Sequence, residues 1–214
     1  MGNTMLFTAL REFTTGLLNQ LLVNLSGQDG QTWLEEFKKF LRRETCWIET
    51  LESFFLKTVQ IVLEPTEEEF NVVRDISKIL PTKKEGGKVD WRDPDIEKWF
   101  GEITVKGRAS KVVSSLYRFL KTLTHGKIIS IGEKFKIYKK HNIFDALELT
   151  QKLIDTGEIE KKGTGVIIYL EEKYNNSLCW LSVYRNSDGE LRVRVFAWVD
   201  LGPEWNAGGG VLFS

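Results

Sequence analysis

Hydrophobic residues near the start of the chain recur every three or four positions, which is the spacing of one face of an α-helix. This spacing predicts an amphipathic helix over residues 4–25, where the apolar positions include Leu6, Leu10, Phe13, Leu17 and Leu21. A polar turn at 26–30 ends it. A second helix is predicted over 31–44, with Trp33, Leu34, Phe37, Phe40 and Leu41 on its buried face.

The next hundred residues contain further helical patterns. Residues 47–63 fit either a helix or a strand. Thr66 and Glu69 have the spacing of a capping box, which predicts a helix that starts there and stops before Pro81. A polar loop over 81–95 precedes a short helix over 95–101. The spacing of apolar residues over 109–124 predicts another helix, whose opposite stripe is basic.

Further along the chain, the spacing of the apolar residues changes toward the two-residue period of a β-strand. After Gly132, Phe135 and Ile137 alternate with lysines, which predicts a strand with one basic face. A helix over 143–156 follows, with Gly157 at its C-terminal end. Strands are predicted at 166–171, 178–185, 190–199 and 210–214. The chain is therefore expected to be α+β, with an N-terminal helical region and a C-terminal antiparallel β-meander.

The turn at 186–189, Asn-Ser-Asp-Gly, fixes a register for the predicted 178–199 hairpin. A type I turn with a left-handed glycine pairs Asn186 with Glu190, so that even residues oppose even residues. Trp180 then lies opposite Phe196. The odd face is apolar and predicts a core, whereas the even face carries aromatic and arginine side chains.

The sequence suggests a boundary in the polar loop before residue 89. A helical region over 1–88 would precede a mixed region over 89–214, which contains a basic helix and strand (106–140) and the β-meander (164–214). One compact domain is the alternative. A length of 214 residues, 42% of them hydrophobic, suits either arrangement.

Charge is strongly segregated along the chain. Residues 106–140 contain ten Lys or Arg and a single acid, Glu133, although the whole chain has thirty basic and thirty acidic residues. Clustered cations bind phosphate because each contact releases condensed counterions. We therefore expect a non-enzymatic binding protein whose basic patch contacts a polyanion such as DNA or RNA. The residues expected to bind nucleic acid are Lys111, Arg118, Lys121, Lys127, Lys134, Lys136 and Lys140. The alternative is a solvated surface balanced by the acidic N-terminal half.

The even face of the predicted hairpin supports a different expectation. Trp, Tyr and Arg dominate binding hot spots, so this face predicts a protein–protein interaction adaptor. The residues expected to bind a partner are Trp180, Tyr184, Arg192, Arg194, Phe196 and Trp198. The alternative is that an N-terminal helix covers this face, which would make it part of the core.

Candidate catalytic residues are few. His125 and His141 are the only histidines, they lie beside lysines, and neither has the spacing of a zinc site, so we expect surface or capping roles. Cys46 and Cys179 are expected to be buried free thiols, and one disulfide between them is the alternative. No catalytic constellation emerges, and neither a cofactor nor a metal is expected.

The passage GLLNQLLVNLSGQDGQTWLEEFKKFLRRETCW, residues 16–47, resembles the opening of an uncharacterised family of proteins from bacteria with reduced genomes. The resemblance covers about the first fifth of the chain. It implies no activity, fold or site residues. No signal peptide or membrane-spanning segment is evident, so a cytoplasmic location is expected. The oligomeric state does not follow from these patterns.

Overall fold

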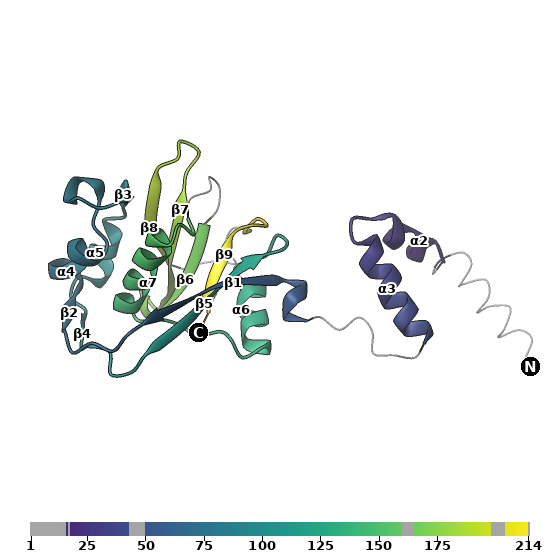
Figure 1. The fold of residues 1–214 in the computed structure, drawn as a ribbon, viewed down its shortest axis with the longest axis horizontal. Helices are drawn as coiled ribbons and strands as arrows, with labels where there is room; N and C mark the ends of the chain where they lie inside the picture. The colour runs from purple at the N-terminus through teal and green to yellow at the C-terminus, as the bar shows by residue number, and fades with distance from the viewer. Residues whose placement is uncertain (1–15, 17, 43–49, 160–164, 198–203, 214) are drawn as a thin grey trace, which may run out of the picture. The chain divides into compact units, whose positions relative to one another are not determined.

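A computed structural model (Figure 1) describes residues 16, 18–42, 50–159, 165–197 and 204–213. The chain forms two compact units, Met1–Thr50 and Leu51–Ser214. The division after Thr50 differs from the boundary that the loop composition suggested near residue 88.

The first unit contains two helices, α2 (Leu18–Ser26) and α3 (Gly30–Leu41), which pack on each other as a hairpin. These helices confirm the helical patterns predicted for the same residues. The expected buried face of α3 is not buried, because Trp33, Leu34 and Phe37 are half-buried and Phe40 and Leu41 are exposed.

The second unit is built on a seven-stranded mixed sheet with the order β1-β5-β9-β6-β7-β8-β3. Neighbouring strands are antiparallel except for β6 with β9 and β3 with β8, which are parallel. The strands are β1 (Phe55–Leu63), β3 (Trp91–Arg92), β5 (Val112–Phe119), β6 (Gly165–Tyr174), β7 (Ser177–Arg185), β8 (Leu191–Ala197) and β9 (Gly210–Phe213). A separate two-stranded sheet pairs β2 (Phe70–Asn71) with β4 (Thr104–Val105).

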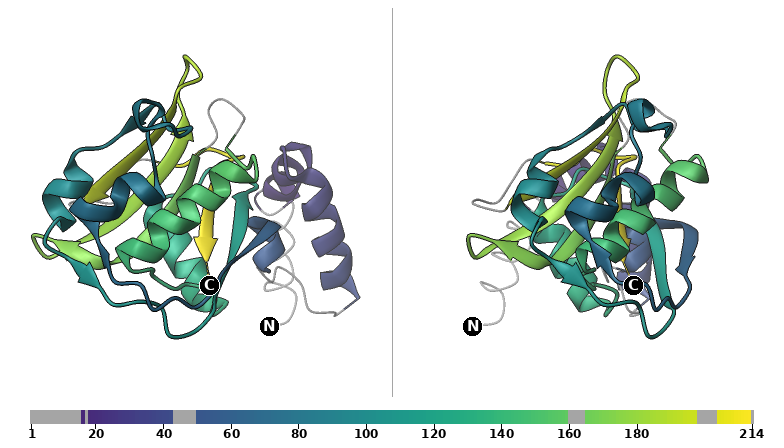
Figure 2. Two further views of the ribbon diagram at one scale, coloured as in Figure 1. Left: turned by 60° about the vertical axis from the view of Figure 1, so that its left-hand side comes forward. Right: turned by 90° about the vertical axis from the view of Figure 1, so that its left-hand side faces the viewer.

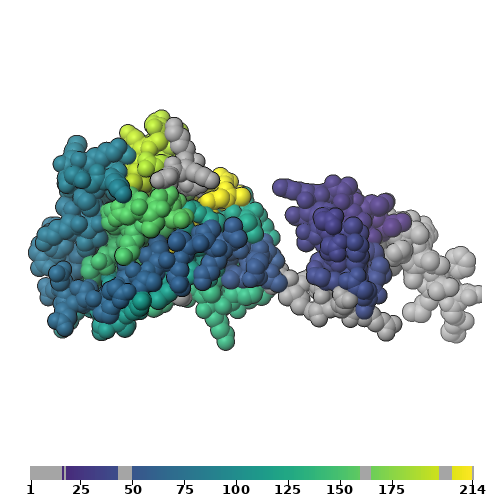
Figure 3. All heavy atoms as spheres, viewed as in Figure 1, coloured from purple at the N-terminus to yellow at the C-terminus, as the bar shows by residue number. Residues whose placement is uncertain are grey.

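Helices cover both faces of the large sheet. On one face, α7 (Ile143–Asp155) packs with α4 (Val72–Ile79) and α5 (Asp95–Phe100) over the larger core (Figures 1 and 2). Figure 3 shows these helices together with β1 on one side of the unit. On the other face, α6 (His125–Lys134) covers a smaller, aromatic core. Two short 3₁₀ turns, η2 (Leu51–Ser53) and η3 (Lys83–Glu85), complete the described elements.

The α+β class is confirmed, but the predicted order of elements is not. Helices are spread through the chain instead of preceding the strands, and the C-terminal strands do not form an antiparallel meander. After β8 the chain returns to the middle of the sheet, where β9 pairs with β5 on one side and runs parallel to β6 on the other. All four residues of β9 are buried, which explains its short continuous apolar sequence.

The predicted helix over 109–124 is wrong, because residues Val112–Phe119 form strand β5. The strand has apolar residues on both faces, with Leu116 in the larger core and Tyr117 and Phe119 in the aromatic core, so it lacks the alternation of a half-exposed strand. Neighbouring strands on both sides, β1 and β9, provide pairing for β-branched and aromatic residues such as Val112 and Phe119. The predicted basic helical stripe therefore does not exist.

The strand predicted after Gly132 is also wrong, because α6 continues to Lys134 and residues 135–140 form a turn and an irregular segment. Thr124 caps this helix, its side chain accepting a hydrogen bond from the Lys127 backbone N–H. A side chain at position 132 would have its Cβ 2.9 Å from Tyr138 Cβ and 3.0 Å from Phe213 Cζ. Glycine is therefore required by close packing rather than as a turn residue.

The β7–β8 hairpin confirms the predicted register. Trp180 pairs with Phe196, and Tyr184 pairs with Arg192. The Asn186 side chain accepts hydrogen bonds from the backbone N–H groups of Asp188 and Glu190, and Gly189 has a φ of 86°. The odd apolar residues of the two strands belong to the larger core, as the alternation predicted: Cys179, Leu181, Val183, Leu191, Val193 and Val195.

Candidate binding site

Side chains on the even face of the β7–β8 hairpin range from buried to exposed. Trp180 is buried in the aromatic core beneath α6, whereas Tyr184, Arg192 and Phe196 are half-buried and Arg194 is exposed. The buried residues of the aromatic core beneath α6 come from β1, β5, β9, β6 and Trp180 of β7, and Phe196 of β8 packs against its edge. Within the second unit, the exposure of Arg194 and Trp91 shows that β8 and the adjoining β3 are open on this face.

Aromatic rings and guanidinium groups form a ladder across this open part of the sheet. Trp180 and Phe196 stack with their ring centroids 5.5 Å apart and an interplanar angle of 15°. The Arg194 guanidinium lies 4.9 Å from the Phe196 centroid and 6.0 Å from that of Trp91 on β3, and Arg192 lies 5.9 Å from Trp91. Cation–π contacts of this kind hold long side chains in place.

The surface also holds a cavity of about 310 Å³. Its walls come from three neighbouring strands and from the segment before β9, which supplies Trp205. Phe196 lines the cavity and also touches Arg194, so the cavity and the ladder form one continuous surface. The lining residues are Gly165, Ser182, Tyr184, Arg185, Phe196, Glu204, Trp205, Asn206 and Gly209.

Trp205 is fixed by a buried histidine. The Trp205 indole Nε1–H donates to His125 Nε2 at 2.8 Å, and His125 Nδ1 lies 2.8 Å from the Tyr169 hydroxyl. An indole N–H can only donate, so Nε2 must be the unprotonated nitrogen and Nδ1 must carry the proton that Tyr169 accepts. Backbone hydrogen bonds in both directions between Leu123 and Trp205 support the same arrangement.

Burial determines the ionisation of His125 and Tyr169. His125 is fully buried, and desolvation lowers its pKa to about 4. Burial likewise raises the pKa of Tyr169 well above its usual value. Both side chains are therefore uncharged at neutral pH, and the His125–Trp205 hydrogen bond is intact.

The histidine prediction was wrong for both residues, since His141 is also buried and desolvation lowers its pKa to about 4. Lysines neighbouring in sequence suggested an exposed position. However, His125 begins α6 on its inward side, and His141 exchanges backbone hydrogen bonds with Tyr169 and Glu171 beside β6.

Of the six residues predicted to bind a partner, the structure brings Tyr184, Arg192, Arg194 and Phe196 to the open surface. Trp180 forms its buried base, and Trp198 lies outside the described residues. Trp91, Arg185 and Trp205 also lie at this surface and were not predicted from the sequence. Trp91 reaches this surface only because β3 pairs with β8. Trp205 follows a break in the strand pattern. The residues around each tryptophan therefore gave no indication of its position.

Three cations of the basic stretch lie against carboxylates. Arg118 pairs with Glu158 at 3.1 Å, Lys111 with Glu64 at 3.3 Å, and Arg108 with Asp145 at 2.8 Å and also with Glu148. Arg118 shares its face of β5 with Leu116, which belongs to the α7 core. Its charge therefore points toward the α7 side of the sheet.

The other predicted nucleic-acid-binding residues lie around α6. Lys121 and Lys127 both stand over the Phe54 ring, with Nζ 4.2 Å and 5.2 Å from its centroid. Phe54 belongs to the core on the α6 side, opposite the side that Arg118 faces. Lys134 ends α6, Lys136 lies in the turn that follows, and Lys140 lies next to His141. The stretch thus divides between the two sides of the sheet.

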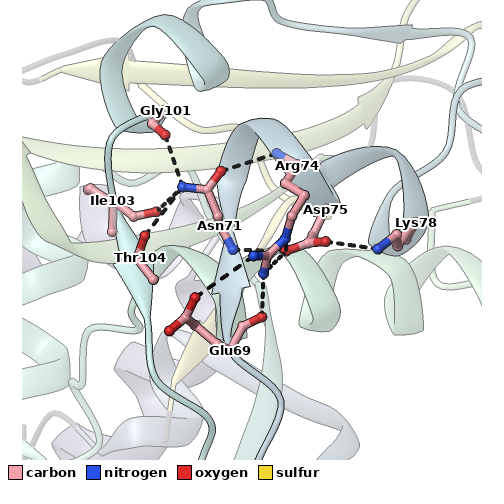
Figure 4. Close-up of polar contacts among 8 residues, drawn as sticks. All are labelled: Glu69, Asn71, Arg74, Asp75, Lys78, Gly101, Ile103 and Thr104. Atoms are coloured by element: carbon pink, nitrogen blue, oxygen red, sulfur yellow. Dashed lines mark hydrogen bonds and ion pairs between the residues drawn. The ribbon is translucent and has the colours of Figure 1, made fainter.

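A second hollow lies beside α4 and is lined in part by Arg74, Asp75 and Lys78, whose hydrogen bonds and ion pairs hold the start of this helix. Asn71, not Thr66, caps α4: its side chain accepts from the Arg74 backbone N–H and donates to the carbonyl oxygens of Gly101 and Ile103 (Figure 4). Asp75 accepts from the Asn71 backbone N–H and pairs with Arg74 and Lys78. The Arg74 hydrogen bond is the largest influence that holds the pKa of Asp75 below its usual range. The polar side chains of Asn71, Arg74, Asp75 and Lys78 thus find hydrogen-bond or ion-pair partners within this part of the fold.

Evidence for catalytic or metal chemistry is sparse in the described part of the chain. It contains no group of three or more His, Cys, Asp or Glu side chains arranged to hold a metal ion. Cys179 is a buried thiol whose pKa is raised by desolvation, which makes it a poor nucleophile. Cys46 lies outside the described residues.

No helix within the described ranges combines the length and apolar composition needed to cross a membrane. The chain matches no protein-family model, and neither the curated proteins nor the solved structures give a significant match.

Proposed function

We propose that this protein is a binding protein that docks a peptide segment of a protein partner on the even face of the β7–β8 hairpin. The observation that carries the proposal is the convergence of Tyr184, Phe196 and Trp205 around an open cavity, with arginines beside them. Aromatic and arginine side chains contribute most of the binding energy in protein interfaces.

The charge of this surface favours a protein over a polyanion. Its arginines, Arg185, Arg192 and Arg194, are accompanied by an equal number of nearby acids, Asp93, Glu190 and Glu204. Arg192 pairs with Glu190 at 2.7 Å, and Arg194 lies 3.8 Å from Asp93. Phosphate binding requires an excess of positive charge, which this surface lacks.

The surface is also held in place before a partner arrives. The Trp180 ring, buried beneath Phe196, lies 4.3 Å from that of His125, and His125 in turn accepts the Trp205 hydrogen bond. Both cavity walls are therefore anchored in the aromatic core. Preorganised side chains lose less conformational entropy on binding, so more of the contact energy contributes to affinity.

The edge of β8 offers a means of holding the partner's backbone. The pairing of β3 with β8 covers Arg192 and Val193 only, whereas β8 extends to Ala197. Among the described strands, none pairs with the outer edge of residues 194–197. An extended peptide could add to this edge while one apolar side chain enters the cavity, as in other cases of β-strand addition.

Selection from a displayed peptide library tests the proposal while the partner is still unidentified. The wild-type chain is the target, and Phe196→Ala with Arg194→Glu is the counter-target. We expect enriched peptides that carry an aromatic or large aliphatic residue and that bind wild type alone. Failure to enrich such peptides, or equal binding to the variant, would overturn the proposal.

A polyanion partner is the second candidate, supported by the position of Lys121 and Lys127 over one aromatic ring. A labelled oligonucleotide titrated across a salt series tests it. Affinity that falls steeply with salt, and falls again in Lys121→Glu with Lys127→Glu, would favour nucleic acid. Binding that is absent at physiological salt, or unchanged in that variant, would remove this candidate.

A further inference from the structure

We propose that the cavity on the even face of the β7–β8 hairpin takes a tyrosine side chain of the docked peptide, and that the Ser182 hydroxyl selects it. This inference rests on the proposed docking function and specifies which side chain enters the cavity. Its basis is a buried hydroxyl that has no hydrogen-bond partner among the described residues and that lines a cavity with aromatic walls.

Burial separates the lining of the cavity into a base, walls and a rim. The base consists of small buried residues, the walls are mainly half-buried rings, and the rim is polar and exposed. From the most buried to the most exposed, the lining residues are Gly165, Ser182 and Gly209, then Tyr184, Phe196 and Trp205 with Arg185, and then Glu204 and Asn206. A side chain that enters the cavity therefore meets rings along its sides and small residues at its end.

Gly165 brings two of the aromatic walls close together. It pairs with Tyr184 across β6 and β7, and a Cβ at this position would lie 3.2 Å from Tyr184 Cβ and 3.5 Å from Trp205 Cζ3. The six-membered ring of Trp205 thus lies next to Tyr184, while its Nε1–H donates to His125. Aromatic rings pack favourably against one another in offset or edge-to-face arrangements, so these walls favour a flat aromatic ligand.

Ser182 places a polar group at the base of the cavity. The residue is only 1% exposed and lies on the even face, opposite Arg194 on β8 and Ile167 on β6. A serine side chain consists of Cβ and Oγ alone, so its hydroxyl lies on the side of the cavity that the residue lines. Within the described residues, no hydrogen bond involves this hydroxyl.

The Ser182 hydroxyl therefore discriminates between ligands that fill the cavity. A ligand removes water from a polar group that it covers, and it loses affinity unless it replaces the hydrogen bonds of that water. A phenylalanine side chain would leave the hydroxyl buried and without a partner. A tyrosine carries its own hydroxyl at the far end of the ring, where it can both donate to and accept from serine.

The charges at the cavity favour an uncharged ligand. One cation and one acid line it, Arg185 and Glu204. The Arg185 guanidinium donates to the Gly189 carbonyl oxygen in the hairpin turn at 2.8 Å, and the Arg194 guanidinium already lies 4.9 Å from the Phe196 centroid. A further cation would be repelled there, and a carboxylate would lose its hydration without an excess of positive charge. The phenol of tyrosine is neutral at pH 7.

Two small probes test this inference directly, since p-cresol reproduces the tyrosine side chain and toluene that of phenylalanine. In NMR titrations of the full chain, p-cresol should bind at least about tenfold more tightly than toluene, because toluene leaves the Ser182 hydroxyl without a partner. In Ser182→Ala the two probes should bind within about twofold of each other, because that hydroxyl is gone.

Ser115→Ala is the matched control, because Ser115 is also a buried serine of the large sheet and does not line this cavity. It should keep the preference for p-cresol. Circular dichroism checks that both variants fold, and the comparison of the two probes on wild type needs neither variant. Equal affinity of wild type for the probes, undetectable binding of p-cresol, or a preference that survives in Ser182→Ala overturns the inference.

Peptides separate a failure of this inference from a failure of the docking function. A selected peptide is made in two forms, with tyrosine or phenylalanine at the position that enters the cavity, and wild type should bind the tyrosine form at least about tenfold more tightly. Binding that requires Phe196 but is equal for the two forms would overturn the tyrosine specificity alone. A preference for p-cresol without any selected peptide would support that specificity and overturn the docking function.

Discussion

The two faces of the β7–β8 hairpin show how one pair of strands serves two roles. On the odd face, Leu181, Val183 and Val193 are fully buried against the α7 side of the sheet. On the even face, Trp180 and Ser182 are buried, whereas Tyr184, Arg192 and Phe196 are half-buried and Arg194 is exposed.

The difference arises from the helices rather than from the strands. α7 packs across its face with α4 and α5 beside it, whereas the aromatic core beneath α6 has no buried member on β8. A sheet face that one helix covers only in part leaves room for a ligand. Substitutions on each face therefore measure how differently the two faces respond to the loss of a side chain.

The largest effect is expected on the covered face. Leu181→Ala should lower the free energy of unfolding by about 4 kcal/mol, because it leaves a cavity in a packed core. Phe196→Ala on the open face should lower it by about 1.5 kcal/mol, since that ring is already half-exposed. Urea unfolding followed by circular dichroism measures both. Equal losses would contradict the proposed difference between the faces.

Acid should destabilise the core beneath the open face through His125. Its pKa is about 4 in the folded chain and about 6.5 when unfolded. Between these values the unfolded chain binds a proton and the folded chain does not, so stability is lost as pH falls. We expect a loss of about 3 kcal/mol from this residue between pH 7 and pH 4.

His125→Gln provides the comparison, because glutamine has no titrating group in this range. The difference in unfolding free energy between wild type and this variant should shrink as pH falls. A difference that stays constant with pH would show that His125 titrates normally in the folded chain.

Trp205→Phe should have a smaller effect, of about 1.5 kcal/mol, because it leaves the buried His125 Nε2 without its donor. It should also loosen one wall of the cavity. Increased iodide quenching of the remaining tryptophans would report that loosening. Unchanged stability and quenching would show that the hydrogen bond does not hold the wall.

Arg194→Ala should have the smallest effect on stability, at most about 0.5 kcal/mol. The Arg194 side chain is 44% exposed, and its distance to Asp93 is 3.8 Å, so it contributes little to folding. A selected peptide should nevertheless bind this variant at least about tenfold more weakly. Unchanged peptide affinity would remove Arg194 from the docking surface.

The hairpin could be predicted from the sequence because its determinants are local. A four-residue turn and a period of two fix which side chains face each way. The structure of the basic stretch could not be predicted from the sequence, because the position of Arg118 depends on whether Val112–Phe119 is a helix or a strand. That choice is made by β1 and β9, which are distant in sequence.

The candidate site was predictable in part for the same reason. Tyr184, Arg192, Arg194 and Phe196 lie on one hairpin, so their common face followed from alternation. Trp91 joins them only because β3 pairs in parallel with β8, and Trp205 only because the chain turns back before β9. Long-range pairing of this kind leaves no periodic signal in either segment.

The affinity of a selected peptide for Phe196→Ala is the most direct test of the docking surface. Phe196 lines the cavity and supports Arg194, so isothermal titration calorimetry should show binding at least about thirtyfold weaker than to wild type. Val73→Ala, an exposed position on α4, should bind as wild type does. Equal affinity of the peptide for wild type and Phe196→Ala would contradict the claim that partners dock on this face.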